Sequence, residues 1–318
     1  MGRYALKRLV QAIPVLIGIS FLLFFLMHSI PGGPLALYIR QPGMTKARLA
    51  QIAALYGLNK PIWVQYIAWL GGAIHGNFGY SYLYGQPATL MMLQRFPATL
   101  EMVLPAFAIA VILSFILGVF SAVRQYSLPD YIITALSYFG MAMPIFWSGL
   151  LVIILFAVKL HWLPAGGMLG TGPGGASIGE RVRHLILPDF TLALLLLAGE
   201  SRYVRAAMLD VLSSDFIRTA RAKGLGERIV MWRHALRNAL LPVVTVMVLD
   251  GAFLLSGAIV TETIFSWPGM GRLFIQAINQ TDYPVIMAIA TYVSILVVVA
   301  NIVADMLYAA LDPRIRLS

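Results

Sequence analysis

Six long apolar runs constrain the fold of this 318-residue chain more than any other feature of its sequence. A hydrocarbon core of ~30 Å is crossed by about 20 apolar residues in a helix. Because the chain is 60% hydrophobic and only 11% charged, it lacks the charged surface that a soluble domain of this length requires. The runs predict six transmembrane helices, at residues 9–30, 99–123, 131–158, 185–199, 239–260 and 284–311. The expected fold class is an all-α polytopic membrane protein.

The first and fourth runs need separate interpretation. Three basic residues precede the first run, as in a signal peptide, but the run is too long and no small-residue cleavage site follows before Pro31. We interpret it as a retained first helix. The fourth run is the shortest. We expect it to begin at Pro188, a residue tolerated in a first turn, with Asp189 at the positive end of the helix dipole.

The distribution of basic residues predicts the orientation of the chain. With the N-terminus inside, 14 Lys and Arg residues fall in cytoplasmic segments and nine in outside segments. Because basic residues accumulate in short cytoplasmic loops, residues 1–8 and 312–318 are both expected in the cytoplasm. The same asymmetry accounts for the net charge of +10 without a nucleic-acid partner. A large extracytoplasmic loop at 31–98, with helical spacing at 45–56, then precedes a five-helix core at 99–311.

The cytoplasmic loop at residues 200–238 carries charge that a bilayer would exclude. Apolar residues recur within it at helical spacing, at Leu225, Ile229, Trp232, Leu236 and Leu240. We expect two short amphipathic helices joined at residues 223–226, where glycine permits a sharp turn. The apolar stripe could lie on the membrane surface with its arginines on lipid phosphates. It could equally dock on a cytoplasmic protein. The residues alone leave both interpretations open.

The sequence of this loop resembles the EAA signature loop of ATP-binding-cassette (ABC) importer permeases. It is most similar to the first permease of the dipeptide and oligopeptide family, through FIRTARAKGL at 216–225 and HALRNALLPVVT at 234–245. Ala220, Gly224 and Leu236 match the general signature. Arg218, Thr219, His234 and Arg237 depart from it in the way typical of the peptide subclass. Further matches follow in order along the chain: IPGGP (30–34), HGNFGYS (75–81), MPIFW (143–147), TETIFSWPGMGR (261–272), DYP (282–284) and DPRIR (312–316).

The resemblance implies a type I ABC importer permease with several partners. These are a second homologous permease, two cytoplasmic ATPase subunits that bind ATP and Mg²⁺, and an extracytoplasmic solute-binding protein. It implies peptides as substrates, with nickel, glutathione or another small solute as the alternatives. It also implies that the loop couples to an ATPase through a defined set of residues: Arg218, Thr219, Ala220, Lys223, Gly224, Leu225, His234, Leu236 and Arg237.

The chain itself lacks the sequence patterns of an ATPase or a metalloenzyme. It has no G-x-x-x-x-G-K-[ST] or H-E-x-x-H segment and no cysteine, and none of its five histidines is at metal-ligand spacing. Gly170, Gly172 and Gly175 have a G-x-G-x-x-G spacing, but no strand precedes them. We therefore expect no cofactor bound by this chain. A secondary transporter would need ion-coupling groups and usually an internal repeat, and we find no convincing repeat.

Asp250 lies near the middle of the fifth predicted span. A carboxylate at that depth costs about 2.5–3.5 kcal/mol on insertion scales, so it is not expected to face lipid. Two interpretations remain. Asp250 could be hydrogen-bonded to a neighbouring span or to the partner permease, or it could face the translocation path, where it would meet a cationic group of the substrate.

Overall fold

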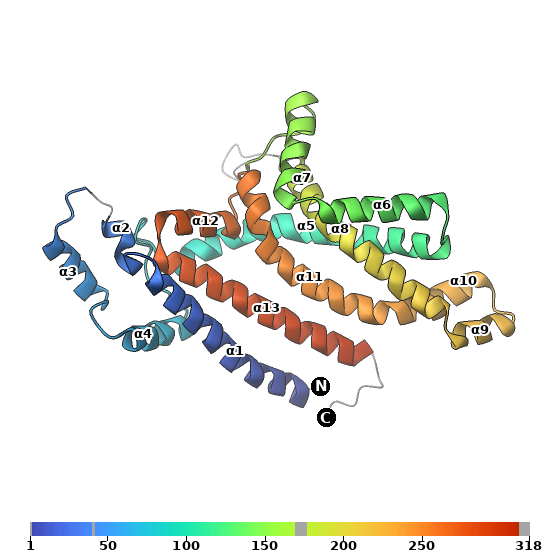
Figure 1. Ribbon diagram of the computed structural model, residues 1–318, viewed down its shortest axis with the longest axis horizontal. Helices are drawn as coiled ribbons and strands as arrows, with labels where there is room; N and C mark the ends of the chain where they lie inside the picture. The colour runs from blue at the N-terminus through green and yellow to red at the C-terminus, as the bar shows by residue number, and fades with distance from the viewer. Residues whose placement is uncertain (1, 40–41, 169–176, 312–318) are drawn as a thin grey trace. The chain divides into compact units, whose positions relative to one another are not determined.

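The computed structural model describes residues 2–39, 42–168 and 177–311 (Figure 1). Every regular element in these ranges is helical, and their one β-bridge joins Tyr80 and Pro87. The all-α expectation is therefore confirmed. The glycines at 170, 172 and 175 and the C-terminal residues 312–318 lie outside the described residues.

The helices are α1 (Gly2–Ser29), η1 (Gly33–Leu35), α2 (Ala36–Ile39), α3 (Lys46–Leu55), α4 (Ile62–Ile74), α5 (Ala88–Val123), α6 (Leu128–Ala142), α7 (Ile145–Val152), η2 (Ile153–Lys159), α8 (Ile178–Leu212), α9 (Asp215–Ala222), α10 (Glu227–Ile229), η3 (Val230–Leu236), α11 (Arg237–Ile264), α12 (Met270–Gln280) and α13 (Tyr283–Leu311).

Four described helices are long and apolar enough to cross a membrane: Leu6–Ser29, Ala88–Val123, Ile178–Leu212 and Tyr283–Leu307. A bent pair, α6 with α7 and η2, makes a fifth if it is counted as one span. The predicted span at 239–260 lies in α11, where the apolar stretch found among the described side chains, Pro242–Gly251, is shorter than a crossing. The number six therefore stays a prediction.

The third predicted span is broken rather than continuous. We expected one helix at 131–158, but α6 ends at Ala142 and the chain bends by 107° before α7 begins at Ile145. Pro144 is the physical cause: it has no N–H for a helical hydrogen bond and disfavours helical geometry at the preceding residue. Met143 accordingly has extended backbone, with ψ of 120°. Figure 1 shows α7 leaving α6 at a sharp corner.

The expected start of the fourth span at Pro188 is wrong. Helix α8 begins ten residues earlier, at Ile178, and contains Pro188 in its interior. The true start is a capping box, in which the Ser177 hydroxyl accepts a hydrogen bond from the Glu180 N–H and the Glu180 carboxylate accepts one from the Ser177 N–H. Helix α5 also begins earlier than expected, at Ala88 rather than residue 99.

The chain forms two compact units. The first comprises Met1–Ala5, Leu100–Trp267 and Val299–Ser318, and the second comprises Leu6–Thr99 and Pro268–Val298. In the second unit, the expected helix at 45–56 is confirmed as α3, and Thr45 caps it by accepting a hydrogen bond from the Arg48 N–H. The apolar helix α4 in the same segment was not expected from the sequence.

Asp282 connects two segments of the second unit that are distant in sequence. It is buried, and it accepts hydrogen bonds from the Ser81 hydroxyl and, at 3.1 Å, from the Tyr82 N–H. Burial raises the pKa of Asp282, and these hydrogen bonds act in the opposite direction. The HGNFGYS and DYP segments quoted above thus meet at one buried carboxyl group.

The first unit is organised around α8, which packs against α6, α7 and α11. It also passes close to α5 at Gly118. A Cβ on Gly118 would lie 2.6 Å from the Ser201 carbonyl oxygen and 2.7 Å from the Val204 side chain. Only glycine permits the two backbones to approach this closely, so Gly118 sets the spacing between α5 and α8.

The orientation can be tested by labelling single cysteines, because the chain has none of its own. Ser213 and Asn279 are both exposed, so burial does not limit access to either position. We expect an impermeant thiol reagent added to intact cells to label Asn279→Cys and to leave Ser213→Cys unlabelled. Both variants should react after the cells are lysed. Labelling of Ser213→Cys alone in intact cells would reverse the topology.

Candidate functional site

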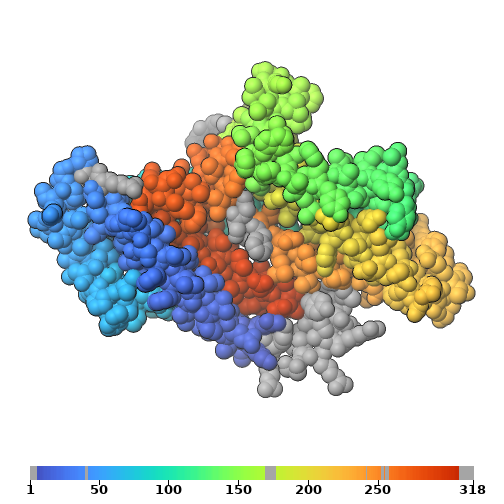
Figure 2. All heavy atoms as spheres, viewed as in Figure 1, coloured from blue at the N-terminus to red at the C-terminus, as the bar shows by residue number. Residues whose placement is uncertain are grey.

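The charged loop has one more helical piece than we expected. The predicted joint at residues 223–226 is confirmed, but the chain also breaks at Ser213 and Ser214, so α9 is separate from α8. Ser214 has extended backbone, with ψ of 153°, and Asp215 in the first turn of α9 favours a new helix start. Figure 2 shows this loop, in golden tones, at the surface of the molecule.

One face of α9 is firmly packed. Ile217 is 0% exposed and Ala220 is 6% exposed. Both belong to one apolar cluster that joins the loop to α5, α8 and α11, and a displacement of α9 would therefore disturb the packing of α8. The buried members are Ala122, Val204, Ala207, Met208, Ile217, Ala220, Val230, Ala235, Ala239, Val243 and Met247.

The other face of α9 and the turn that follows it form an exposed tip, residues 215–229. Arg218, Thr219, Lys223, Gly224 and Leu225 of the predicted coupling set lie there. Two solvent-exposed ion pairs lie on it. Arg218 pairs with Asp215, and Arg221 donates to both carboxylate oxygens of Glu227, at 2.7 and 3.3 Å, across the turn.

Gly224 has a backbone conformation that other residues rarely adopt. Its φ is +75°, and its N–H donates to the Arg221 carbonyl oxygen at 2.9 Å as α9 ends. No atom lies within 4 Å of the place that a Cβ would occupy. Glycine is therefore required here by the backbone angle and not by lack of space.

The remaining residues of the predicted set, His234, Leu236 and Arg237, lie away from the tip on the helix that returns to the core. Leu236 packs against the apolar cluster, whereas Arg237 is exposed. The predicted apolar stripe is largely unpacked: Ile229 is 48% exposed and Trp232 is 63% exposed. The structure thus leaves apolar surface beside the charged tip.

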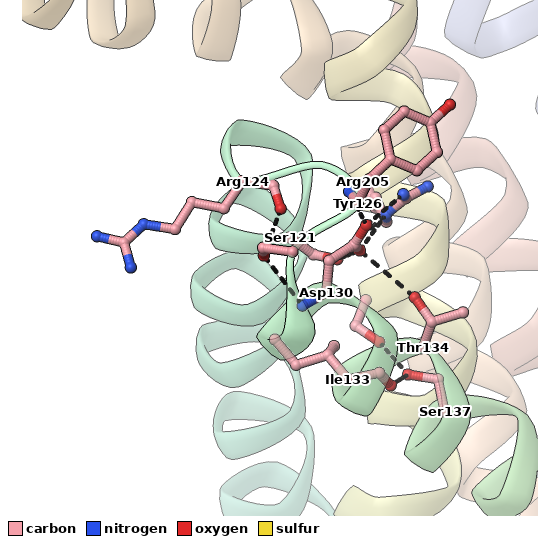
Figure 3. Close-up of polar contacts among 10 residues, drawn as sticks. Ser121, Arg124, Tyr126, Asp130, Ile133, Thr134, Ser137 and Arg205 are labelled. Atoms are coloured by element: carbon pink, nitrogen blue, oxygen red, sulfur yellow. Dashed lines mark hydrogen bonds and ion pairs between the residues drawn. The ribbon is translucent and has the colours of Figure 1, made fainter.

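An ion-pair network beside the loop escaped the sequence analysis (Figure 3). Asp130, at the start of α6, is 2% exposed and is held by both sides of the Arg205 guanidinium, with two N–O distances of 2.8 Å. It also accepts hydrogen bonds from the Ser121 hydroxyl and from the Tyr126 N–H, the latter at 2.9 Å. One carboxylate therefore joins the end of α5, the α5–α6 turn, α6 and α8.

The sequence indicates the position of Asp130 at a helix start but not its pairing with Arg205. Ser127, Pro129 and Asp130 form a helix-start pattern, and the Ser127 hydroxyl does accept a hydrogen bond from the Asp130 N–H. Arg205 was one basic residue among many. Its partner is 75 residues away, and no spacing rule connects the two positions.

Asp250 lies on α11, is half-buried and is paired with a second acid. Glu200 of α8 is close enough for the two carboxyl groups to interact directly. Glu200 is 3% exposed, and neither of its carboxylate oxygens has a hydrogen-bond donor among the described residues. Two ionised carboxylates accept hydrogen bonds and donate none, whereas a proton held by one of the two acids can be donated to the other. Sequence reasoning missed Glu200 because the fourth span was expected to end at residue 199.

No metal site accompanies these acids in the part of the chain that the structure describes. There, no group of three or more His, Cys, Asp or Glu side chains is arranged to hold an ion. The features of the first unit that bear on function are therefore an exposed charged loop, a set of packed helices and one pair of neighbouring acids.

Long apolar helices joined by a charged, exposed loop are typical of a polytopic membrane protein. Two family models give the particular family. Residues 114–317 match the "Binding-protein-dependent transport system inner membrane component", and residues 1–103 match the N-terminal part of such membrane components. The chain belongs to this family of inner membrane permeases.

Known proteins of similar sequence cover the whole chain. The oligopeptide transport system permease protein AppB of Bacillus subtilis (strain 168) is 46% identical over 317 residues, which are 99% of this chain and 100% of the relative. The dipeptide transport system permease protein DppB of Escherichia coli (strain K12) is 40% identical over 337 residues, covering 99% of each chain. The ABC permease resemblance inferred from the sequence is thus confirmed.

A solved structure supports the fold. A crystal structure of an amino acid ABC transporter with histidines has a TM-score of 0.53 to this chain and covers 70% of it and 94% of the solved chain. Sequence identity is 12%, so the similarity concerns the fold alone. It confirms the ABC permease fold class.

The Asp130–Arg205 pair predicts a measurable loss of stability. Arg205→Gln leaves a buried carboxylate without its cation, which costs about 3 kcal/mol. We expect a thermal midpoint lower by several degrees for the purified, assembled transporter. Arg202→Gln is the matched control, since Arg202 stacks on the Tyr138 ring at 4.1 Å and has no carboxylate partner among the described residues. Equal midpoints for Arg205→Gln and the wild type would contradict a stabilising role.

Proposed function

We propose that the chain is the translocating permease of an ATP-driven importer of dipeptides or oligopeptides. The observation that carries the proposal is the full-length identity of 46% and 40% to relatives named oligopeptide and dipeptide permeases. The chain would form half of the translocation pathway, and a second homologous permease would form the other half. A solute-binding protein outside the cell would deliver the substrate.

The exposed tip at 215–229 is the proposed contact with a cytoplasmic ATPase subunit. Two ATPase subunits would bind ATP and Mg²⁺ and would supply the hydrolysis. Their closure would push on the tip, and the buried Ile217 and Ala220 would pass the movement into α8 through the apolar cluster. The permease chain needs no nucleotide site of its own for this role.

The ion pairs of the tip favour docking on a protein over lying on the membrane surface. Arg218 and Arg221 are already paired, with Asp215 and Glu227. These two pairs offset part of the positive charge of the tip and so weaken its attraction to lipid phosphates. Fixed ion pairs on a rigid helix are suited to setting the register of a protein interface.

The substrate class is tested by uptake in a strain that lacks the native gene and expresses the chain with its cognate subunits. We expect a labelled dipeptide or tripeptide to be accumulated and to bind the cognate external protein. Accumulation of nickel or of glutathione, without peptide uptake, would assign the alternative substrates. Uptake that persists without the ATPase subunits would instead indicate a secondary transporter.

Two glycines of the tip offer a matched test of coupling. Gly224 has φ of +75° and Gly226 has φ of −62°, and at neither would an added Cβ meet another atom. Gly224→Val therefore strains the backbone, whereas Gly226→Val does not. We expect Gly224→Val to insert normally but to lose most uptake and most stimulation of ATP hydrolysis by the binding protein. Membrane levels of both variants serve as the control, and equal uptake by the two would remove Gly224 from coupling.

The acid pair predicts a charge-dependent defect in transport. We place Asp250 and Glu200 on the translocation path, because a buried acid pair without a donor attracts a cationic group of the substrate. Asp250→Asn keeps the size of the side chain and removes its charge. We expect normal assembly, with the uptake of lysine-containing dipeptides reduced more than that of neutral ones.

The exposed Asp210 of α8 supplies the control for this experiment, because Asp210→Asn removes the same charge outside the core. It should leave the ratio of cationic to neutral uptake unchanged. A well-assembled Asp250→Asn transporter that keeps the wild-type ratio would leave Asp250 with a packing role only.

A further inference from the structure

A groove of about 620 Å³ lies in the first unit, between the last turns of α5 and the segment formed by η3 and the start of α11. This volume is in the range of sites that hold small organic ligands. Nine of the ten lining residues are apolar, and Arg124 is the exception. The groove is lined by Phe115, Ile116, Val119, Phe120, Val123, Arg124, Met231, Trp232, Leu236 and Leu240.

The α5 wall of the groove is a straight stripe that ends in a cation. Its residues are four apart, as Ile116, Phe120 and Arg124 are, and therefore lie on one helix face. From Phe115 to Arg124 the wall is about 13 Å long. Its apolar side chains are open to contact: Ile116 is 57% exposed and Val123 is 50% exposed.

Arg124 is exposed and has no acidic partner among the described residues. Its guanidinium carbon lies 5.0 Å from the centre of the Phe120 ring, which holds the side chain at the mouth of the groove. Figure 3 shows the guanidinium directed away from the Asp130–Arg205 network. The contrast with Arg205 is direct, because Arg205 uses its charge on Asp130 and Arg124 keeps its charge available.

Besides Arg124, the exposed Trp232 indicates a membrane interface at this groove. It is 63% exposed and lines the groove from η3, the segment that directly follows the exposed tip. Tryptophan with one open face is typical of the level of lipid headgroups. An apolar wall that ends in an unpaired arginine, with a tryptophan across from it, has the polarity profile of a phospholipid.

We propose that this groove binds an anionic phospholipid of the cytoplasmic leaflet, with an acyl chain along α5 and the phosphate at Arg124. The proposal rests on the proposed function only for the orientation that places Arg124 at the cytoplasmic side. Arginine suits the phosphate because its planar fork donates two parallel hydrogen bonds. The bound lipid would fill the space between α5 and the helix that returns from the tip.

The test is lipid binding by the complete transporter, purified with its partner subunits and stripped of lipid. Native mass spectrometry with added phosphatidylglycerol or phosphatidylcholine counts the lipids bound. We expect a site that prefers phosphatidylglycerol. Arg124→Gln should weaken phosphatidylglycerol binding about fivefold, the effect of one basic residue at an anionic surface. The binding of phosphatidylcholine should not change.

Two further variants separate the two parts of the site. Ile116→Trp fills the groove at an exposed position and should lower the binding of both lipids. Lys46→Gln removes an equal charge from an exposed position on α3 and should change neither. Equal phosphatidylglycerol binding by the wild type and Arg124→Gln would overturn the proposal, as would unchanged binding by Ile116→Trp.

A photo-crosslinking amino acid at position 116 identifies the occupant directly. A lipid adduct supports the proposal, whereas an adduct with the partner permease would overturn it in favour of a subunit interface. Recovery of the ATPase subunits is scored in the same preparation. Absence of the ATPase subunits would count against the proposed function. Lipid binding by the purified permease would still show whether the groove holds a phospholipid.

Discussion

A hydrocarbon layer offers no hydrogen-bond partner to a peptide group, and this constraint determines where the chain can be irregular. The long runs are therefore helical, and each interruption requires a substitute partner or a protected place. The break at Met143 and Pro144 is an example. Its backbone is extended, and the Met143 N–H donates to the Gly140 carbonyl oxygen at a long 3.4 Å. A broken helix of this kind is tolerated at membrane depth where protein or a watered path surrounds it.

The proposed coupling requires the first unit to transmit force, and its contacts are tight where the loop meets the helices. Gly118 allows α5 to touch the backbone of α8, and Arg205 ties α8 to the α5–α6 turn through Asp130. Ile217 and Ala220 fix α9 to the same helices. Packed interiors are stiff, so a push on α9 reaches α8 as a displacement rather than being absorbed locally. The proposed coupling depends on this stiffness.

Periodicity and residue type predicted the parts of the structure that depend on local chemistry. The helical class, α3 and the glycine joint at residues 223–226 all follow from local preferences. Pro188 led to a wrong prediction of where α8 begins, because proline is favoured at a helix start but is also found, at some cost, in a helix interior. Ser177 and Glu180 were the better signal, since a capping box requires two residues at a fixed spacing.

Contacts between residues that are distant in the sequence could not be predicted from the sequence. Nothing in a single sequence pairs Asp130 with Arg205 or Ser81 with Asp282, because both pairs depend on how helices pack. Glu200 was not predicted as a site residue for a related reason. Its neighbours Gly199 and Ser201 look like the end of an apolar run, and only the continuation of α8 to Leu212 places it in the core.

The buried acids of the first unit differ in how many hydrogen bonds they accept. Asp130 and Glu200 are equally well buried, at 2% and 3% exposed, yet Asp130 accepts five hydrogen bonds and Glu200 accepts none among the described residues. An acid that already has its partners contributes to the stability of a resting fold. An acid without them is costly to keep ionised, and the proposed transport role would supply a cation from the substrate. The half-buried Asp250 beside Glu200 gives such a cation a second point of contact, and this is why the acid pair, rather than the saturated network, is the place to look for contact with the substrate.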